Sequence, residues 1–173
     1  MRRSFWSIVL LLAALLVAPA SPAAAAPYCG IVWGSLAKSA PGSSQAPVVD
    51  VRTGRHECYD RLVIDVAGDA GGYTAQYVTH VTAEGSGAVI PTRGGAALQI
   101  TVRDPAWTYS PANRNELRNV TGYRTFRQVV YAGTFEGYTS FGLGVRARLP
   151  FRVFVLDGPG TSSRVVVDVA HRW

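Results

Sequence analysis

The three histidines and eleven acidic residues are the side chains most able to do chemistry, and their spacing builds no recognised catalytic motif. His56 and Glu57 begin like the zinc-binding helix of a metalloprotease. The residues that follow are Cys58, Tyr59 and Asp60, so the second histidine of that motif is missing. No G-x-S-x-G sequence marks a serine nucleophile, and no residues stand at metal-ligand spacing. We predict a protein that is not an enzyme and has no cofactor or metal; a small secreted hydrolase that uses two carboxylates is the alternative.

Aromatic and basic side chains gather in residues 104–122, a long segment without helix or strand periodicity. Loops of this length in a compact domain are often functional. The rings of Trp107 and Tyr109 could stack on sugars, while Arg114 and Arg118 could contact anions. We predict these four residues as a ligand-binding site. In the alternative interpretation, Trp107 is a plug that covers one end of the core.

Arginine and aspartate recur at the same spacing in two similar segments. Residues 61–67 have the sequence R-L-V-I-D-V-A, and residues 164–170 have R-V-V-V-D-V-A. Residues four apart in a strand share a face but lie about 13 Å from each other, so neither segment pairs its own arginine and aspartate. We predict cross-strand ion pairs that fix the register, made by Arg61, Asp65, Arg164 and Asp168. A role in ligand binding is the alternative.

The elements that would position these residues are short β-strands. The clearest is a final hairpin, in which Phe151–Asp157 and Arg164–Val169 flank a turn rich in glycine, proline and serine. Upstream, alternating or β-branched runs predict strands at residues 48–52, 61–66, 71–82, 88–90, 97–103, 129–133 and 134–145. Residues 37–47 lack periodicity and indicate a connector. We predict an all-β fold, an antiparallel two-sheet β-sandwich of about seven to nine strands.

The N-terminal residues predict export. Arg2 and Arg3 precede an apolar run, Ile8–Ala18, which has the length of a signal-peptide core rather than of a membrane span. Small residues then favour cleavage at Ala25 or Ala26, which leaves about 148 of the 173 residues. We therefore predict that residues 1–26 are a signal peptide and that the mature protein is secreted or in the cell envelope, without membrane association. An uncleaved anchor is the alternative.

Both cysteines, Cys29 and Cys58, lie in the mature part of the chain. In an oxidising compartment, two cysteines most simply form one disulfide, which stabilises a small domain by about 2–4 kcal/mol. Lipidation of Cys29 would favour a small residue before it, where Tyr28 stands, and metal binding lacks partner ligands. We predict a Cys29–Cys58 disulfide.

Basic residues are dispersed along the chain, and nearly all of them are arginines. The formal net charge is +6, and removal of Arg2 and Arg3 lowers it to +4. An arginine-rich surface suits carboxylates and phosphates, although a GC-rich genome produces the same composition. The absence of a basic cluster in an exported protein argues against nucleic-acid binding.

The order of several motifs resembles the AMIN-like domain of secreted actinobacterial proteins. These motifs are Y-D-R-L-V-I-D at 59–65, F-E-G at 135–137, F-G-L-G at 141–144, P-F-R-V-F at 150–154 and S-R-V-V-V-D-V at 163–169. The last two also resemble the AMIN domain of cell-wall amidases and secretins. The resemblance covers residues 47–173. Residues 27–46, which precede it, are predicted to be a disulfide-tethered segment and linker, because they contain Cys29 and lack periodicity.

This resemblance implies a β-sandwich that docks onto the cell envelope. No catalytic domain follows the matching residues, so it implies a stand-alone binding module rather than an amidase. The expected partner is a cell-wall glycan such as peptidoglycan, or an associated polymer. The alternative is a protein–protein adaptor that binds an envelope protein through an exposed sheet edge. The oligomeric state is left open.

Overall fold

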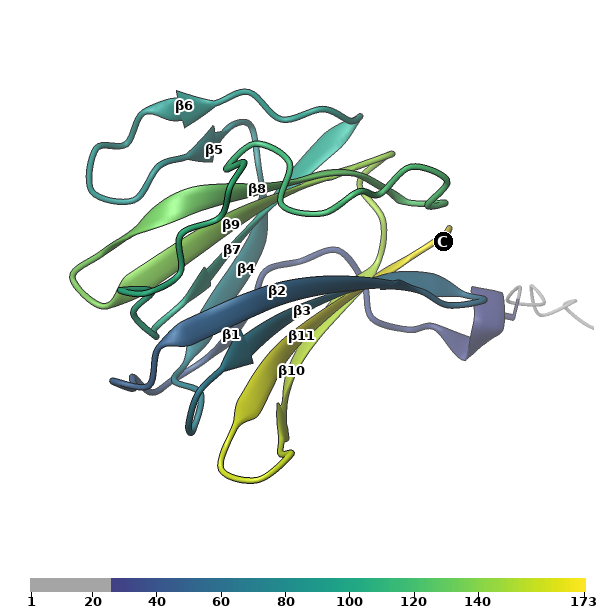
Figure 1. Cartoon of the computed structure of the whole chain (residues 1–173). Coiled ribbons are helices and arrows are strands. Elements are labelled where there is room, and N and C mark those ends of the chain that lie inside the picture. The colour runs from purple at the N-terminus through teal and green to yellow at the C-terminus, as the bar shows by residue number, and fades with distance from the viewer. Residues whose placement is uncertain (1–25) are drawn as a thin grey trace, which may run out of the picture.

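A computed structural model describes residues 26–173, and the predicted signal peptide lies outside the described residues except for Ala26. The chain folds into two antiparallel sheets that pack face to face (Figure 1). The first sheet has five strands in the order β1-β4-β7-β9-β8, and the second has four in the order β10-β11-β3-β2. A two-stranded ribbon, β5-β6, lies on the outer side of the first sheet. The predicted all-β antiparallel sandwich is confirmed.

The strands are short, and most connections between them are tight. Among the described residues the only helical element is a 3-10 turn at Tyr28–Gly30, and no helix is long and apolar enough to cross a membrane. The strands are β1 (Lys38–Ala40), β2 (Val48–Arg55), β3 (Tyr59–Val66), β4 (Tyr73–Val78), β5 (Val81–Thr82), β6 (Val89–Ile90), β7 (Ala96–Val102), β8 (Phe126–Phe135), β9 (Tyr138–Val145), β10 (Phe151–Asp157) and β11 (Ser163–Ala170).

The core lies between the two sheets and is built from alternate residues of each strand. In β3, for example, Leu62 and Ile64 are fully buried, because side chains two apart in a strand point to the same side. The first sheet contributes Phe141 from β9, and β10 contributes Phe151. The sequence predicts most strands from such alternation of apolar and polar residues, and the structure shows the same alternation of buried and exposed side chains.

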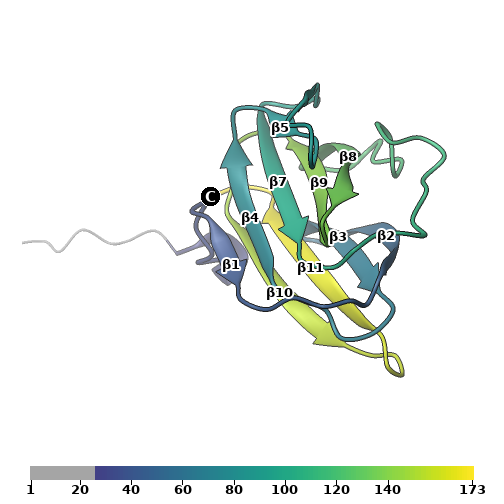
Figure 2. The ribbon, with the colours of Figure 1, turned by 90° about the vertical axis from the view of Figure 1, so that its left-hand side faces the viewer.

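Two strand predictions were wrong in detail. Residues 71–82 do not form one strand, because the chain bends at Thr79 and His80 and then enters β5, which pairs with β6. The predicted connector at residues 37–47 contains β1, which pairs with β4 at the edge of the first sheet (Figure 2). Three residues are too few for periodicity to reveal a strand, so only the pairing partner identifies β1.

The two similar sequence segments lie side by side as β3 and β11, the central strands of the second sheet. Their register places Arg61 opposite Asp168, Val63 opposite Val166, and Asp65 opposite Arg164. Exchange of the two strands maps this register onto itself, so β3 and β11 are related by an approximate local two-fold axis, with β2 and β10 on their outer sides. This symmetry sets the pattern of charges on the outer face of the sheet.

The predicted disulfide is confirmed and attaches the N-terminal segment to the second sheet. Cys29 and Cys58 are bonded at an S–S distance of 2.05 Å. Beyond the disulfide, Phe151 N donates to Gly34 O at 2.9 Å, so the segment also covers the start of the edge strand β10. Residues 27–40 therefore pack along the sandwich.

Candidate functional site

The segment between β7 and β8, residues 103–125, holds all four residues predicted to bind a ligand. It runs along the side of the sandwich where the edge strands β8 and β2 lie (Figure 2). Leu117 N donates to Val129 O of β8 at 2.9 Å, and Val48 N of β2 donates to Pro105 O at 2.7 Å. Leu117 and Val120 are buried in the core. The segment is therefore attached to both sheets.

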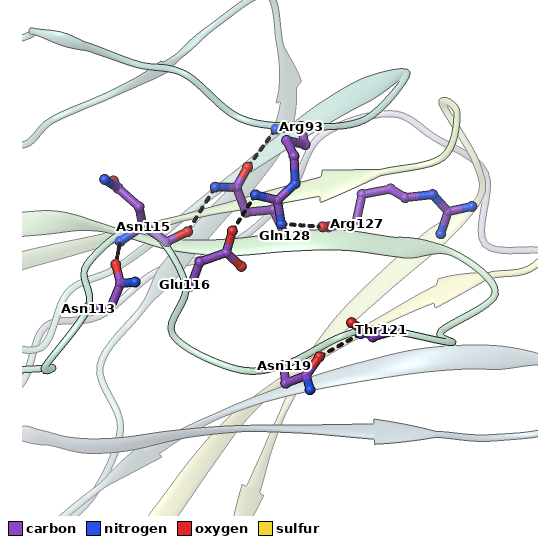
Figure 3. Close-up of polar contacts among 8 residues, drawn as sticks. All are labelled: Arg93, Asn113, Asn115, Glu116, Asn119, Thr121, Arg127 and Gln128. Carbon is purple, nitrogen blue, oxygen red and sulfur yellow. Dashed lines mark hydrogen bonds and ion pairs between the residues drawn. The ribbon is translucent and has the colours of Figure 1, made fainter.

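Asparagine side chains fix two turns of this segment (Figure 3). Asn113 Oδ1 accepts a hydrogen bond from the backbone N–H of Asn115, and Asn119 Oδ1 accepts one from that of Thr121, both at 2.9 Å. Asparagine favours such turns because its side-chain oxygen accepts from the backbone N–H two residues later and so mimics the carbonyl of a backbone turn. Hydrogen-bonded turns, and no helix, therefore order residues 113–121.

Gln128 of β8 connects the segment to the first sheet (Figure 3). Its Oε1 accepts from Arg93 N at 2.6 Å, and its Nε2 donates to Asn115 O at 2.8 Å. The Arg93 guanidinium forms an ion pair with Glu116 and donates to Arg127 O at 3.2 Å. Because Gln128 is buried, these bonds satisfy its amide and hold the surrounding backbone in place.

A pocket of about 440 Å³ opens between this segment and the beginning of β2. An ion pair between Arg118 and Asp50 lies on its wall. Tyr109 also lines the pocket, and its buried hydroxyl has no hydrogen-bond partner among the described residues. Burial raises the pKa of Tyr109, so the hydroxyl keeps its proton at neutral pH. The lining residues are Val49, Asp50, Thr108, Tyr109, Ser110, Pro111, Ala112, Asn113, Glu116, Leu117 and Arg118.

The structure brings two of the four predicted ligand residues together. Tyr109 and Arg118 line the pocket, whereas Trp107 and Arg114 do not. Trp107 is 67% exposed, so it is not the plug considered as an alternative. Arg114 stacks on the ring of Tyr131, with its guanidinium carbon 5.0 Å from the ring centre. The residue that closes the core on this side is Tyr109, which packs edge-on against Tyr131 at 5.4 Å.

A second group of functional side chains lies on the outer face of the second sheet. Asp168 is fully buried there and accepts hydrogen bonds from Arg61 Nε at 2.6 Å and Nη2 at 2.9 Å. Arg152 Nε donates to the same carboxylate at 2.9 Å. The hydrogen bonds to Asp168 raise the pKa of Arg61. Asp168 therefore joins three strands, at the cross-strand position that the sequence predicts for it.

Asp65 and Arg164 stand opposite each other in the register but form no ion pair. Asp65 instead accepts two hydrogen bonds from Arg52, at 2.6 Å from Nε and 2.7 Å from Nη2. The residue directly opposite Asp65 in β2 is Asp50, so Arg52, which stands opposite Val63, reaches Asp65 diagonally. The predicted pair of Asp65 with Arg164 is replaced by a pair with Arg52, because the repeated pattern of β3 and β11 does not reveal this neighbour in β2.

Aromatic rings surround the arginines of this face, and sequence reasoning missed them. The guanidinium of Arg152 lies 4.5 Å from the ring centre of Trp33 and 4.9 Å from that of Phe154. That of Arg61 lies 5.3 Å from Tyr59. Alternation within β10 places Arg152 and Phe154 on one face, which could have revealed half of the cluster. Trp33 comes from the disulfide-bonded segment and carries no such signal.

Thr125, just before β8, and His171, just after β11, form contacts that stabilise the fold. Thr125 Oγ1 lies 3.1 Å from His171 Nδ1 and donates to Ala170 O, while Asp60 Oδ2 accepts from Thr125 N and Phe126 N. Thr125 is fully buried, so these groups join the start of β8 to the end of β11. Residues 26–173 contain no group of three histidine, cysteine or acidic side chains that could hold a metal ion.

Comparison with known protein families identifies a match over most of the chain. The sequence model of the AMIN-like domain matches residues 46–171, which include every strand except β1 and also the loop pocket. No curated protein matches the chain in sequence.

Proposed function

The chain belongs to the AMIN-like domain family, and we propose that it is an exported, non-catalytic module that binds peptidoglycan or an associated polymer of the cell envelope. AMIN-like domains are in general non-catalytic binding modules related to the cell wall, and they occur in extracellular or envelope proteins. The proposal assigns residues 1–26 to a signal peptide, residues 27–46 to a disulfide-tethered segment, and residues 47–173 to the binding domain.

The loop pocket is the observation that carries this proposal. Its walls hold hydroxyl, amide, carboxylate and guanidinium groups from a single segment whose turns are fixed by hydrogen bonds. A polar pocket of this kind can bind the hydroxyl and amide groups of a glycan without first ordering the loop.

The surroundings of the pocket supply stacking and charge. The exposed indole of Trp107 precedes the pocket residues directly in sequence and offers a flat apolar surface to a sugar ring. Arg114 forms no ion pair among residues 26–173, so its charge is available to an anionic polymer. Arg118 is partly neutralised by Asp50 and serves better as a hydrogen-bond donor.

A sedimentation assay on purified peptidoglycan tests the proposal. The oxidised mature protein is expected to pellet with the polymer at low salt, and retention should weaken as salt rises. Arg114→Ala with Arg118→Ala should reduce retention, whereas Arg172→Ala, a surface arginine stacked on Tyr28 away from the loop, should not. Retention unchanged by the double variant would place the site elsewhere, and no retention at any salt would contradict the proposal.

One edge of the second sheet favours a second candidate function, binding of an envelope protein by strand addition. β10 is an edge strand, and the N-terminal segment covers only its beginning. Farther along, Val155 and Leu156 are 37% and 39% exposed. Exposed strand edges with apolar side chains are sites for an added strand. Proline at position 155 should block such a partner in crosslinking without affecting retention on peptidoglycan.

A further inference from the structure

One arginine on the outer face of the second sheet lacks an acidic partner. Arg52, Arg61 and Arg152 all form ion pairs on this face. Arg164 forms none among residues 26–173, because the carboxylate opposite it, Asp65, binds Arg52 with both oxygens. The face thus has two carboxylates and four arginines, and it keeps an excess of positive charge.

The guanidinium of Arg164 also has an unused donor. Its Nη2 donates to Asp157 O at 3.2 Å, but its Nε is buried and has no hydrogen-bond partner among the described residues. A buried N–H without an acceptor destabilises the folded state, and the cost is larger when the group is charged. The site is therefore one that an added anion would stabilise.

Arg164 lines a pocket of about 250 Å³ that has a basic rim and an apolar floor. Val63 and Val166 belong to the outer face of the sheet, yet they are only 9% and 1% exposed, because neighbouring long side chains cover them. Gly54 leaves a hollow beside them, since a Cβ at this position would have only His56 Nε2 nearby, at 3.7 Å. The lining residues are Arg52, Thr53, Gly54, His56, Arg61, Val63, Leu156, Arg164 and Val166, and none of them is acidic.

We propose that this pocket binds a carboxylate attached to a small apolar group. Arg164 would turn its guanidinium toward the pocket and hold the carboxylate through Nε–H together with an Nη–H, a two-point contact that matches carboxylate geometry. The apolar group would lie against Leu156, which lines the pocket and is 39% exposed, with Val63 and Val166 beneath it. Phosphate has no apolar group that could make this contact. The terminal residue of a short peptide ending in alanine has this chemistry. The site is separate from the loop pocket and does not depend on glycan binding there.

Nuclear magnetic resonance of the arginine Nε–Hε groups tests the proposal directly. Addition of acetyl-alanine, as the L and the D form, to the oxidised mature protein should shift the Arg164 Nε–Hε signal in a saturable way. Acetyl-alanine amide, which lacks the carboxylate, should not shift it. Inorganic phosphate should bind at least several-fold more weakly, because it gains nothing from the apolar floor.

Two variants separate the pocket from general charge. Arg164→Gln removes the anion contact without breaking an ion pair and should weaken binding by about tenfold or more. Gly54→Leu fills the hollow, leaves all arginines in place and should abolish binding. Arg118→Gln, in the loop pocket, is the matched control and should leave acetyl-alanine binding unchanged.

Three results would overturn the inference: no shift of the Arg164 signal up to ~20 mM acetyl-alanine, an equal response to the amide, or phosphate binding that Gly54→Leu leaves unaffected. The last result would mean an adventitious ion only. Arg164 and Trp107 belong to different surfaces. An absence of acetyl-alanine binding would therefore not contradict the proposed glycan site at the loop. In the same way, an absence of peptidoglycan binding would not contradict the proposed carboxylate site at Arg164.

Discussion

At the scale of single residues, Asp168 is the acidic side chain on which the second sheet depends most. It is fully buried and is shared by Arg61 and Arg152, which reach it from the strands on either side. Asp65 on the same face is one-fifth exposed and binds a single arginine. Breaking a buried ion pair costs far more than breaking an exposed one, because the charges that remain are poorly hydrated.

We therefore expect Asp168→Asn to lower the free energy of unfolding by about 2–3 kcal/mol. Asp65→Asn should lower it by about 1 kcal/mol or less, because Arg52 is half exposed and can turn to water. Urea denaturation of the two variants beside the wild type measures both effects. Equal losses would show that burial of Asp168 has no energetic consequence.

Asp104 should make stability depend on pH. It is fully buried at the end of β7, its Oδ1 accepts from Gly71 N at 2.8 Å, and its Oδ2 has no partner among the described residues. Burial raises the pKa of Asp104 from its ordinary 3.8 to about 6. Between these two values the folded protein holds the proton that the unfolded chain has released. The free energy of unfolding therefore falls as pH rises through this window, by up to about 3 kcal/mol from this group.

Asp104→Asn should remove this contribution. The amide oxygen can still accept from Gly71 N, and the variant carries no charge at any pH. The difference in free energy of unfolding between variant and wild type should shift by about 2–3 kcal/mol in favour of the variant from pH 4 to pH 7. Denaturation at half-unit pH steps would measure it, and parallel curves would contradict the assigned pKa.

At the scale of elements, the two related hairpins show what sequence can and cannot predict. The repeated R-x-x-x-D pattern predicts that β3 and β11 are neighbours, and their register places Arg61 opposite Asp168. The pattern does not show how β2 meets β3, where Asp50 stands opposite Asp65 and Arg52 lies diagonal to it. Because Arg52 binds both oxygens of Asp65, Arg164 lacks a carboxylate, and this asymmetry of the face could not be predicted from the repeat.

Glycines inside β9 are the clearest case of close approach. A Cβ at Gly144 would lie 1.9 Å from Arg93 O, whereas one at Gly54 in β2 would meet nothing nearer than 3.7 Å. Strand glycines often mark such a place. Gly144→Ala should therefore lower stability by about 3 kcal/mol, while Gly54→Ala should be nearly neutral. Thermal unfolding of the two variants measures this contrast, and similar midpoints would show that Arg93 moves aside freely.

At the scale of the whole molecule, the fold was predictable and the site only partly so. Alternating strands and turn residues are local signals, and they were sufficient for a two-sheet sandwich. The long segment at residues 104–122 was recognised by its lack of periodicity, which also located Tyr109 and Arg118. Two features of the sites depend on contacts between distant segments and could not be predicted. One is the contribution of Asp50 of β2 to the loop pocket, and the other is the position of Trp33 against Arg152.

The two proposed binding surfaces occupy different parts of the sandwich. The loop pocket lies along the side where β8 and β2 end the sheets, and the arginine pocket lies on the outer face of the second sheet. A module with two such surfaces could hold a polymer at one and a small carboxylate at the other. The variants proposed for each surface leave the other intact, so the two can be measured independently.

The most direct test of the central claim compares two tryptophans that are equally exposed. Trp107 adjoins the loop pocket and Trp173 lies near the C-terminus, and both are 67% exposed. Binding isotherms on purified peptidoglycan should show Trp107→Ala weakened by about tenfold, the loss of one ring-stacking contact, and Trp173→Ala unchanged. Equal affinities for the two variants and the wild type would contradict an envelope-binding site at this loop.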